Sequence, residues 1–125
     1  MLNTAPLIGF IATTDFSHAR KFYGDLLGLK IGAESPFALD IDAAGTMLRV
    51  IKVEQVKPAP YTVLGWSVPH IGKSAAQLSD KGVAFERYPG MQQDDLGIWT
   101  SPSGARVAWF KDPDGNVLSL TEFQS

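Results

Sequence analysis

The first apolar stretch of the chain, residues 7–12, is too short for a helix and is typical of a buried strand. A helix is expected after it, because Asp15 or Ser17 is a suitable N-cap and Gly28 suits the left-handed position that ends a helix. Between these limits, apolar residues recur at helical spacing, namely Ala19, Phe22, Tyr23 and Leu26. We predict that this apolar face packs on a sheet.

The residues after this helix predict three further strands and one tight turn. The strands are expected at about 29–33, 37–41 and 46–53. In the second of them, Phe37, Leu39 and Ile41 alternate with smaller or polar residues and should share one side. The turn at Asp42–Gly45 is predicted to be of type I, with its glycine in the fourth position.

The second half of the chain repeats this order after a linker. Residues 55–60, QVKPAP, lack periodicity and contain two prolines. The elements expected beyond the linker are a strand at 61–68, a helix at 71–81, and strands at 83–88, 105–111 and 117–123. A longer insert, residues 89–104, separates the third and fourth of these elements, and Asp112–Gly115 predicts a turn like the first one.

The order β-α-β-β-β therefore occurs twice. The fold class predicted from this duplication is α+β, with two tandem βαβββ modules that form a curved mixed sheet around a cleft and carry the helices outside. Each module alone has roughly 60 residues and buries little surface, so we expect one domain over residues 1–125. Module 1 is expected at about 5–54 and module 2 at about 61–124.

Composition and charge narrow the possible functions. The 125 residues are 45% hydrophobic, have a net charge of −2 and contain no block of Lys and Arg, which argues against a nucleic-acid binder. No apolar run approaches the roughly 20 residues of a membrane span, and residues 1–6 lack the positive start of a signal peptide. We therefore expect a cytoplasmic protein with no membrane partner. Because the chain has no cysteine, disulfides, thiolate nucleophiles and zinc–cysteine sites are excluded.

Two motifs connect this duplication with a known family. FYGDLLGLKI, residues 22–31, closes the first predicted helix, and FKDPDGNVLSL, residues 110–120, leads into the last predicted strand. Together with the paired modules, they resemble the vicinal oxygen chelate superfamily, which includes glyoxalase I, extradiol dioxygenases and bleomycin-resistance proteins. The resemblance covers nearly the whole chain and implies the glyoxalase/bleomycin resistance fold. We also expect a homodimer.

For metal-using members, the resemblance implies four inward positions that hold a divalent ion with His, Glu or Gln. Counting four residues past each turn glycine gives Arg49 and Ser119, and the first strands of the modules give about Ile8 and Val63. This set is unsuited to a divalent cation, because two members lack a donor atom, Ser is a poor neutral ligand and Arg is itself positive. We therefore expect no metal and no other cofactor.

Strand alternation predicts where the side chains around Ser119 point. Leu118 and Leu120 should face the helix, so that Ser119 and Thr121 face the cleft. Glu122, the nearest carboxylate, has the opposite parity and does not replace the missing ligand. The resemblance implies that Ser119 stands at the place of a metal-binding carboxylate.

Arg49 is the sharpest candidate for ligand binding. Either it replaces the lost metal as an anchor for an anion or a carbonyl group, or its head reaches solvent at the edge of the sheet. Trp99, in the insert, is expected as a mobile wall of the cleft or as ordinary packing, while Trp66 should point toward the helix as core. Further apolar side chains expected to line the cavity are Phe10, Met47 and Phe37.

The remaining polar candidates are weaker. His18 and His70 stand near the starts of the two helices, outside the expected cleft. Asp94 and Asp95 lie in a polar loop, either as a solvated tip or as a lid whose carboxylates reach the ligand. The sequence contains no nucleophile elbow, phosphate loop or triad-like grouping, so catalytic residues stay unassigned.

These patterns favour a metal-independent protein that binds an aromatic or anionic metabolite or drug in the cleft between the modules. The residues expected to contact this small-molecule ligand are Arg49, Trp99, Ser119 and Thr121. The alternative is an enzyme, either a glyoxalase-like lyase or isomerase, a dioxygenase-related enzyme, or a metal-free relative with Asp94 or Asp95 as its base. A third possibility is an interaction module without a ligand.

Overall fold

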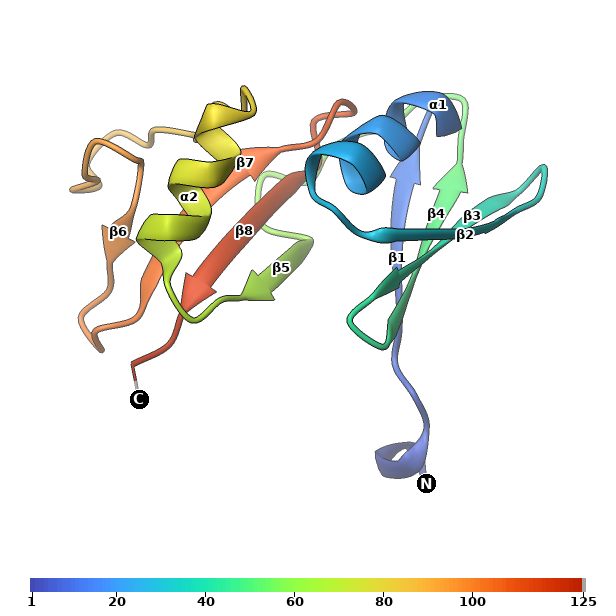
Figure 1. The fold of residues 1–125 in the computed structure, drawn as a ribbon, viewed down its shortest axis with the longest axis horizontal. Coiled ribbons are helices and arrows are strands. Elements are labelled where there is room, and N and C mark those ends of the chain that lie inside the picture. Colours follow the sequence, from blue (N-terminus) through green and yellow to red (C-terminus); the bar gives the residue numbers. More distant parts are fainter. Residues whose placement is uncertain (125) are drawn as a thin grey trace. The chain divides into compact units, whose positions relative to one another are not determined.

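The chain divides into two compact units, Met1–Lys57 and Pro58–Ser125 (Figure 1). The computed structural model describes residues 1–124. The boundary between the units falls inside the linker predicted at residues 55–60. None of the helices within residues 1–124 combines the length and the apolar character needed to cross a membrane.

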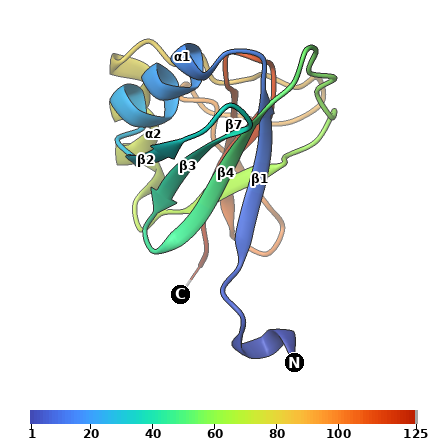
Figure 2. The same ribbon diagram turned by 90° about the vertical axis from the view of Figure 1, so that its right-hand side faces the viewer.

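The first unit is a four-stranded mixed sheet with one helical segment against it (Figure 2). Its elements are a short 3₁₀ turn η1 (Leu2–Thr4), β1 (Ile8–Thr13), α1 (Phe16–Ala19), η2 (Arg20–Leu26), β2 (Lys30–Glu34), β3 (Ala38–Ala43) and β4 (Thr46–Lys52). The strand order is β1-β4-β3-β2, with β1 parallel to β4 and the other neighbours antiparallel. The predicted order β-α-β-β-β is confirmed in this unit.

The helical segment begins and ends where the sequence predicts. The carboxylate of Asp15 accepts a hydrogen bond from the backbone N–H of Ser17 at 2.7 Å, which satisfies one of the free donors at the helix start. Past α1 the segment continues as the π-helical η2, which the sequence did not predict. Ala19 and Tyr23 are buried on the face toward the sheet, and Gly28 has φ +77°, the left-handed conformation that glycine adopts without strain.

The hairpin between β3 and β4 differs from its prediction. Ala43 pairs with Thr46, and the two residues between them, Ala44 and Gly45, have φ 51° and 88°. Two positive φ values in a two-residue loop define a type I′ turn, so the type I turn predicted at Asp42–Gly45 is wrong. The physical reason is strand twist, because the type I′ turn matches the right-handed twist of the paired strands.

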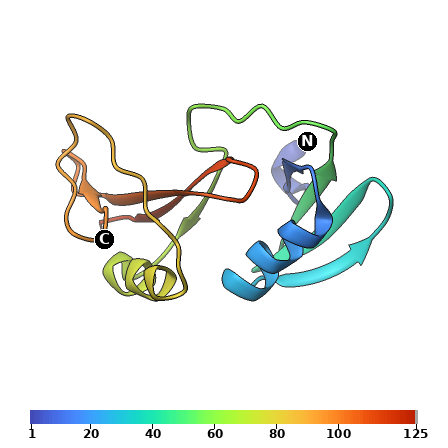
Figure 3. The same ribbon diagram turned by 90° about the horizontal axis from the view of Figure 1, so that it is seen from above.

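The second unit has the same plan with shorter strands. Its elements are β5 (Leu64–Ser67), α2 (Ile71–Asp80), β6 (Trp99–Thr100), β7 (Arg106–Lys111) and β8 (Val117–Glu122). The strand order is β5-β8-β7-β6, again with one parallel pair, β5 and β8. Within each unit, the helical segment lies on one side of its own sheet (Figure 3). The α+β class with two such modules is therefore confirmed.

The turn before β8 is the one that the sequence predicts. The N–H of Gly115 donates to the carbonyl oxygen of Asp112 at 3.0 Å, and Gly115 has φ 86°. The buried carboxylate of Asp112 accepts hydrogen bonds at 2.9 Å from the backbone N–H groups of Asp114 and Asn116 and from the Asn116 side chain. This closed network sets the register of the strand that follows.

The strand predicted at Val83–Tyr88 is wrong. This segment makes one backbone hydrogen bond toward β7, from Glu86 N to Trp109 O at 2.8 Å, and forms no ladder. The side chain of Gln93 takes the place of a neighbouring strand, because it accepts from Tyr88 N at 2.9 Å and donates to Glu86 O at 2.9 Å. The edge strand β6 comes instead from the insert.

The core of each unit lies between its sheet and its helical segment. In the first unit it includes Ile11, Leu39, Ile41, Leu48 and Val50. In the second unit it includes Ile71, Ala75, Ala108, Phe110, Leu118 and Leu120. Trp66 stacks on the core residue Phe110 with ring centres 6.4 Å apart, so it points toward the helix as predicted, although it is only half-buried. We call the opposite side of each sheet the first open face and the second open face, respectively.

Candidate ligand-binding site

The second open face is defined by the register of β5, β8, β7 and β6. Ser119 on β8 lies between Gly65 on β5 and Trp109 on β7, as the paired residues of the two ladders. The alternation predicted around this residue is observed, because Leu118 and Leu120 pair with core positions on β7. The other members of this face are Ser67, Trp99, Val107 and Thr121.

Ser119 carries a hydroxyl group that the protein leaves unused. The residue is only 6% exposed, yet within residues 1–124 its Oγ has no hydrogen-bond partner. The space in front of it exists because residue 65 is glycine, since a Cβ atom there would lie 2.9 Å from Ser119 Oγ. A half-enclosed hydroxyl facing such a notch can both donate to and accept from a bound molecule.

Three aromatic rings form a cluster centred on Trp109, the cross-strand neighbour of Ser119. The rings of Tyr88 and Trp109 are 5.5 Å apart and nearly perpendicular, at 81°. The rings of Trp109 and Trp99 are 6.0 Å apart and tilted by 37°. All three side chains are half-buried, so part of each ring reaches the surface. These are the distances and angles of favourable aromatic pairs, and the arrangement offers both ring faces and ring edges to a ligand.

Sequence reasoning found Trp99 and missed its two neighbours. Trp99, for which the sequence leaves a mobile wall or ordinary packing open, belongs to β6 and pairs with Val107. Trp109 was within reach, because it alternates with the core residue Phe110 and must therefore face the other way. Tyr88 had no usable signal, because the segment that carries it was assigned to a strand that does not form.

The charges near this cluster are paired. Burial raises the pKa of the Tyr88 hydroxyl above its usual 10.0, the negative charge of Glu86 raises it further, and Lys111 opposes the shift. The Lys111 ammonium group lies 3.4 Å from a carboxylate oxygen of Glu86. Tyr88 therefore stays neutral at physiological pH, and its hydroxyl remains a hydrogen-bond donor.

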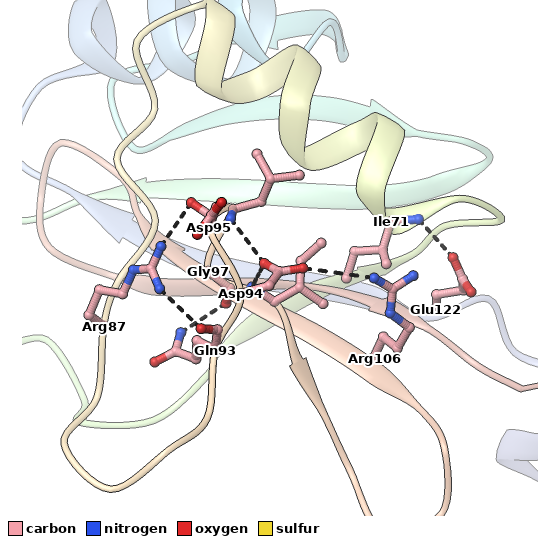
Figure 4. Close-up of polar contacts among 10 residues, drawn as sticks. Ile71, Arg87, Gln93, Asp94, Asp95, Gly97, Arg106 and Glu122 are labelled. Carbon is pink, nitrogen blue, oxygen red and sulfur yellow. Dashed lines mark hydrogen bonds and ion pairs between the residues drawn. The ribbon is translucent and has the colours of Figure 1, made fainter.

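The insert beside Trp99 is tied down by polar contacts (Figure 4). Arg87 donates to the carbonyl oxygen of Asp95 at 2.8 Å, and Gln93 donates to the carbonyl oxygen of Gly97 at 2.8 Å. The carboxylate of Asp94 accepts from two backbone N–H groups of its own loop at 2.9 Å and lies 4.0 Å from Arg106. Asp94 thus holds the loop through Oδ1, and its Oδ2 faces Arg106.

An open pocket borders this insert. Its volume is about 600 Å³, and it is lined by Gly90, Gln92, Gln93, Asp94, Ile98, Trp99 and Thr100. Trp99 therefore borders both the pocket and the aromatic cluster. The polar lining includes Gln93 and Asp94, whose side chains already bond within the loop.

The first open face combines apolar side chains with one ion pair. Arg49 lies between Phe10 on β1 and Asp40 on β3, and its Nε donates to Asp40 Oδ1 at 2.9 Å. Phe10 is 61% exposed, and Ile8 pairs with the exposed Met47 farther along the same two strands. The guanidinium is thus oriented by Asp40, and its charge is partly balanced.

Two residues of the first unit, Phe37 and Asp40, differ from what the sequence predicts. Phe37 precedes β3, is 78% exposed and lies beside Lys52, at the opposite end of β4 from Met47. Asp40, the partner of Arg49, was missed because the predicted type I turn gives a different cross-strand register. With the observed two-residue hairpin, Asp40 and Arg49 are directly opposite each other.

The four positions at which the resemblance implies metal ligands do not fit a divalent ion. Ile8 and Val63 have no donor atom, Arg49 is a cation that already binds Asp40, and Ser119 has one neutral hydroxyl. In the described part of the chain, residues 1–124, no three residues among His, Cys, Asp and Glu gather into a possible site.

The two histidines do not change this conclusion about metal ligands. The His18 side chain is exposed and lies 3.9 Å from the carboxylate of Asp15 at the start of the first helical segment. His70 is the exposed N-cap residue of α2, where the side chain of Glu122 accepts the hydrogen bond from Ile71 N at 2.8 Å. Both histidines are near helix starts, as predicted.

Comparison with known proteins identifies one superfamily by sequence and the same fold among solved structures. The family model of the Glyoxalase/Bleomycin resistance protein/Dioxygenase superfamily matches residues 5–120. The uncharacterized protein YraH of Bacillus subtilis is 28% identical, over 88% of this chain and 91% of that protein. Among solved structures, the antibiotic binding protein TnmS3 from Streptomyces sp. CB03234 has a TM-score of 0.74 at 24% identity and 99% coverage of both chains. Lactoylglutathione lyase from Agrobacterium tumefaciens has a TM-score of 0.74 at 16% identity, with 95% and 93% coverage.

Proposed function

This chain belongs to the Glyoxalase/Bleomycin resistance protein/Dioxygenase superfamily, and we propose that it is a metal-independent binding protein for a small aromatic or anionic molecule. The observation that carries the proposal is the unused hydroxyl of Ser119 beside Trp109, whose ring packs against those of Tyr88 and Trp99. Small-molecule sites combine apolar and aromatic walls with a few polar groups that fix orientation. Thr121, on the same face two residues along β8, supplies a second hydroxyl.

The first open face supports the same proposal from its own side chains. Phe10 and Met47 offer exposed apolar surface, and Arg49 has terminal nitrogens that are not bonded to Asp40. We propose that this guanidinium anchors a carbonyl or anionic group of a molecule bound on the first open face, with Asp40 as the residue that positions it. Substitution Arg49→Ala should then weaken ligand binding and leave the fold intact, as measured by circular dichroism.

The names of the structural neighbours point to two activities, binding and catalysis. One neighbour is an antibiotic binding protein and another is a lyase, and both share this fold at low sequence identity. The residues here favour binding, because Asp94 is engaged in holding its loop and Asp95 is exposed. The expectations of a cleft between the modules, a homodimer and a cytoplasmic location stay predictions.

The proposal is tested by a thermal-shift screen of aromatic metabolites and drugs, followed by tryptophan fluorescence titration with each hit. Because Trp99 and Trp109 border the site, a bound ligand should change the fluorescence of the protein. The variant Trp109→Phe should weaken binding, whereas Trp66→Phe on the helix side of the same sheet is the matched control and should not. A screen of several hundred such compounds without one stabilising hit would refute the proposal.

A second test addresses the metal. Elemental analysis of the purified protein should find far less than one equivalent of nickel, zinc, iron or manganese per chain, because the four positions lack suitable donors. A near-stoichiometric metal that disappears in the Ser119→Ala or Arg49→Ala variant would contradict the proposal. Turnover of a hemithioacetal or a catechol would favour the enzymatic alternative.

A further inference from the structure

We infer that the second open face takes an uncharged, flat aromatic ring system that carries a hydroxyl or carbonyl oxygen, and that Ser119 hydrogen-bonds this oxygen. This inference rests on the proposed function and narrows its ligand class. It follows from three features of the second unit: the charges on the face, the unused hydroxyl, and the placement of the indole rings.

The middle of this face carries no charged side chain. In the described part of β5, β6, β7 and β8, the residues on it are Gly65, Ser67, Trp99, Val107, Trp109, Ser119 and Thr121. The nearest ammonium group, that of Lys111 at the end of β7, is already paired with Glu86. A charged ligand group would lose water here without gaining a counter-ion, which is costly. A neutral group avoids that cost.

The hydroxyl of Ser119 selects for an oxygen on the ligand. A hydroxyl group offers one donor and two acceptor sites, and this one uses none of them within residues 1–124. The Gly65 notch leaves room for an atom of the ligand in front of Ser119 Oγ. A hydrogen bond formed in this half-enclosed position gains more than one exposed to water, because the hydroxyl is only 6% exposed.

The indole ring of Trp109 favours a ligand in which the oxygen that binds Ser119 is attached to an aromatic ring. Trp109 is the cross-strand neighbour of Ser119, so a group bonded to that hydroxyl lies beside the indole. Trp99 continues the aromatic surface, with its ring centre 6.0 Å from that of Trp109. A flat ring system can stack on this surface while its oxygen reaches Ser119.

Four naphthalene derivatives of equal ring size test the inference at pH 7. They are 2-naphthol, which is neutral, 2-naphthoate, which is anionic, 2-naphthylmethylammonium, which is cationic, and 2-methylnaphthalene, which has no oxygen. Titration calorimetry with the wild-type protein should give the lowest Kd for 2-naphthol, by about fivefold over 2-methylnaphthalene and by more over either ion. Tighter binding of 2-naphthoate than of 2-naphthol would overturn the neutral ligand class.

Substitution Ser119→Ala separates the hydrogen bond from the aromatic contact. It should weaken 2-naphthol binding about fivefold and leave 2-methylnaphthalene unchanged, because one neutral hydrogen bond contributes about 1 kcal/mol. The matched control is Ser79→Ala on the exposed side of α2, which should change neither affinity. Equal weakening of both ligands by Ser119→Ala would overturn the role of this hydroxyl, and a circular dichroism melt of each variant excludes unfolding as the cause.

The outcome for the inference is distinct from that for the proposed function. If the wider screen yields a ligand but 2-naphthol binds no better than the ions, the inference is wrong and the binding function stands. If neither the screen nor the four naphthalenes bind, both fail together. Loss of 2-naphthol binding in Trp109→Phe, with binding retained in Trp66→Phe, supports the placement on this face.

Discussion

Gly65 and Ser119 should be energetically coupled in a way that a double-mutant cycle can measure. In the wild-type protein, a Cβ atom at position 65 would lie 2.9 Å from Ser119 Oγ and 3.4 Å from Ser119 O. The first distance is shorter than side-chain carbons adopt, so Gly65→Ala requires a shift, while the second is ordinary contact. In a Ser119→Ala background the atom responsible for the overlap is absent.

Gly65→Ala should therefore change the free energy of unfolding in opposite directions in the wild-type and Ser119→Ala backgrounds. Overpacking of one methyl group in a well-packed region costs about 1–3 kcal/mol, and the lower end applies here because a hydroxyl group can rotate. Against this, Gly→Ala stabilises by about 0.4–1 kcal/mol through the unfolded chain, since φ of Gly65 is not in the left-handed region. We expect Gly65→Ala to destabilise the wild-type protein by about 1 kcal/mol and to stabilise the Ser119→Ala variant by about 0.5 kcal/mol. The coupling energy is then about 1.5 kcal/mol.

Urea unfolding at 25 °C, monitored by tryptophan fluorescence and by circular dichroism, measures all four free energies of unfolding. Coincidence of the two probes checks that the transition is two-state. For a chain of this length, a change of 1 kcal/mol shifts Tm by about 4 °C, so thermal melts provide an independent measure. A coupling energy below about 0.5 kcal/mol, or destabilisation by Gly65→Ala in both backgrounds, would refute the notch in front of Ser119.

Three further predictions concern polar side chains in the two units. Gln93→Ala should destabilise the second unit by about 3 kcal/mol and speed hydrogen exchange of the Tyr88 amide, because Gln93 makes three hydrogen bonds to the backbone. The control Gln92→Ala, at an exposed residue, should do neither. The Tyr88 hydroxyl should titrate above pH 10.0, so its contribution to stability is present below that value and is lost as the pH rises through the folded-state pKa. Absorbance at 295 nm, compared with that of the Tyr88→Phe variant, measures this titration. The substitution Glu86→Gln should lower the pKa of Tyr88. The Asp15 carboxylate has a lowered pKa, first because it accepts a hydrogen bond from the Ser17 N–H. Its stabilisation of the protein relative to the Asp15→Asn variant should therefore be present above pH 3.8 and shrink as the pH falls through the folded-state pKa. Urea unfolding midpoints of both proteins across this pH range measure the effect.

Much of the candidate site was accessible from local patterns. The parity of Ser119, Thr121 and Arg49 follows from counting along strands of period two, and the structure has the same alternation. The weakness of the metal site follows equally, because it depends only on which side chains stand at those positions. The N-cap at Asp15 and the glycine at the end of the first helical segment also depend on neighbouring residues alone.

Local sequence patterns do not predict which residues become partners across neighbouring strands. Asp40 meets Arg49 only because the hairpin has two residues in its loop, and a turn of another type shifts the pairing. Tyr88 joins Trp109 although it belongs to no strand, and Gln93 supplies the hydrogen bonds that the expected strand would have made. Each of these contacts joins residues whose separation in sequence carries no periodic signal.

Local patterns define the duplicated modules, the places of the two turns and the side of the sheet on which Arg49, Ser119 and Thr121 stand, because those properties depend on local backbone conformation and on the two-residue and 3.6-residue periods. Which strand borders β7, which carboxylate holds Arg49 and which rings pack on Trp109 depend instead on the tertiary structure. The physical reason is that register between strands is settled by competition among many hydrogen bonds and packed side chains. Such a competition is decided in three dimensions, and single residues such as Gln93 and Ala44 tip it.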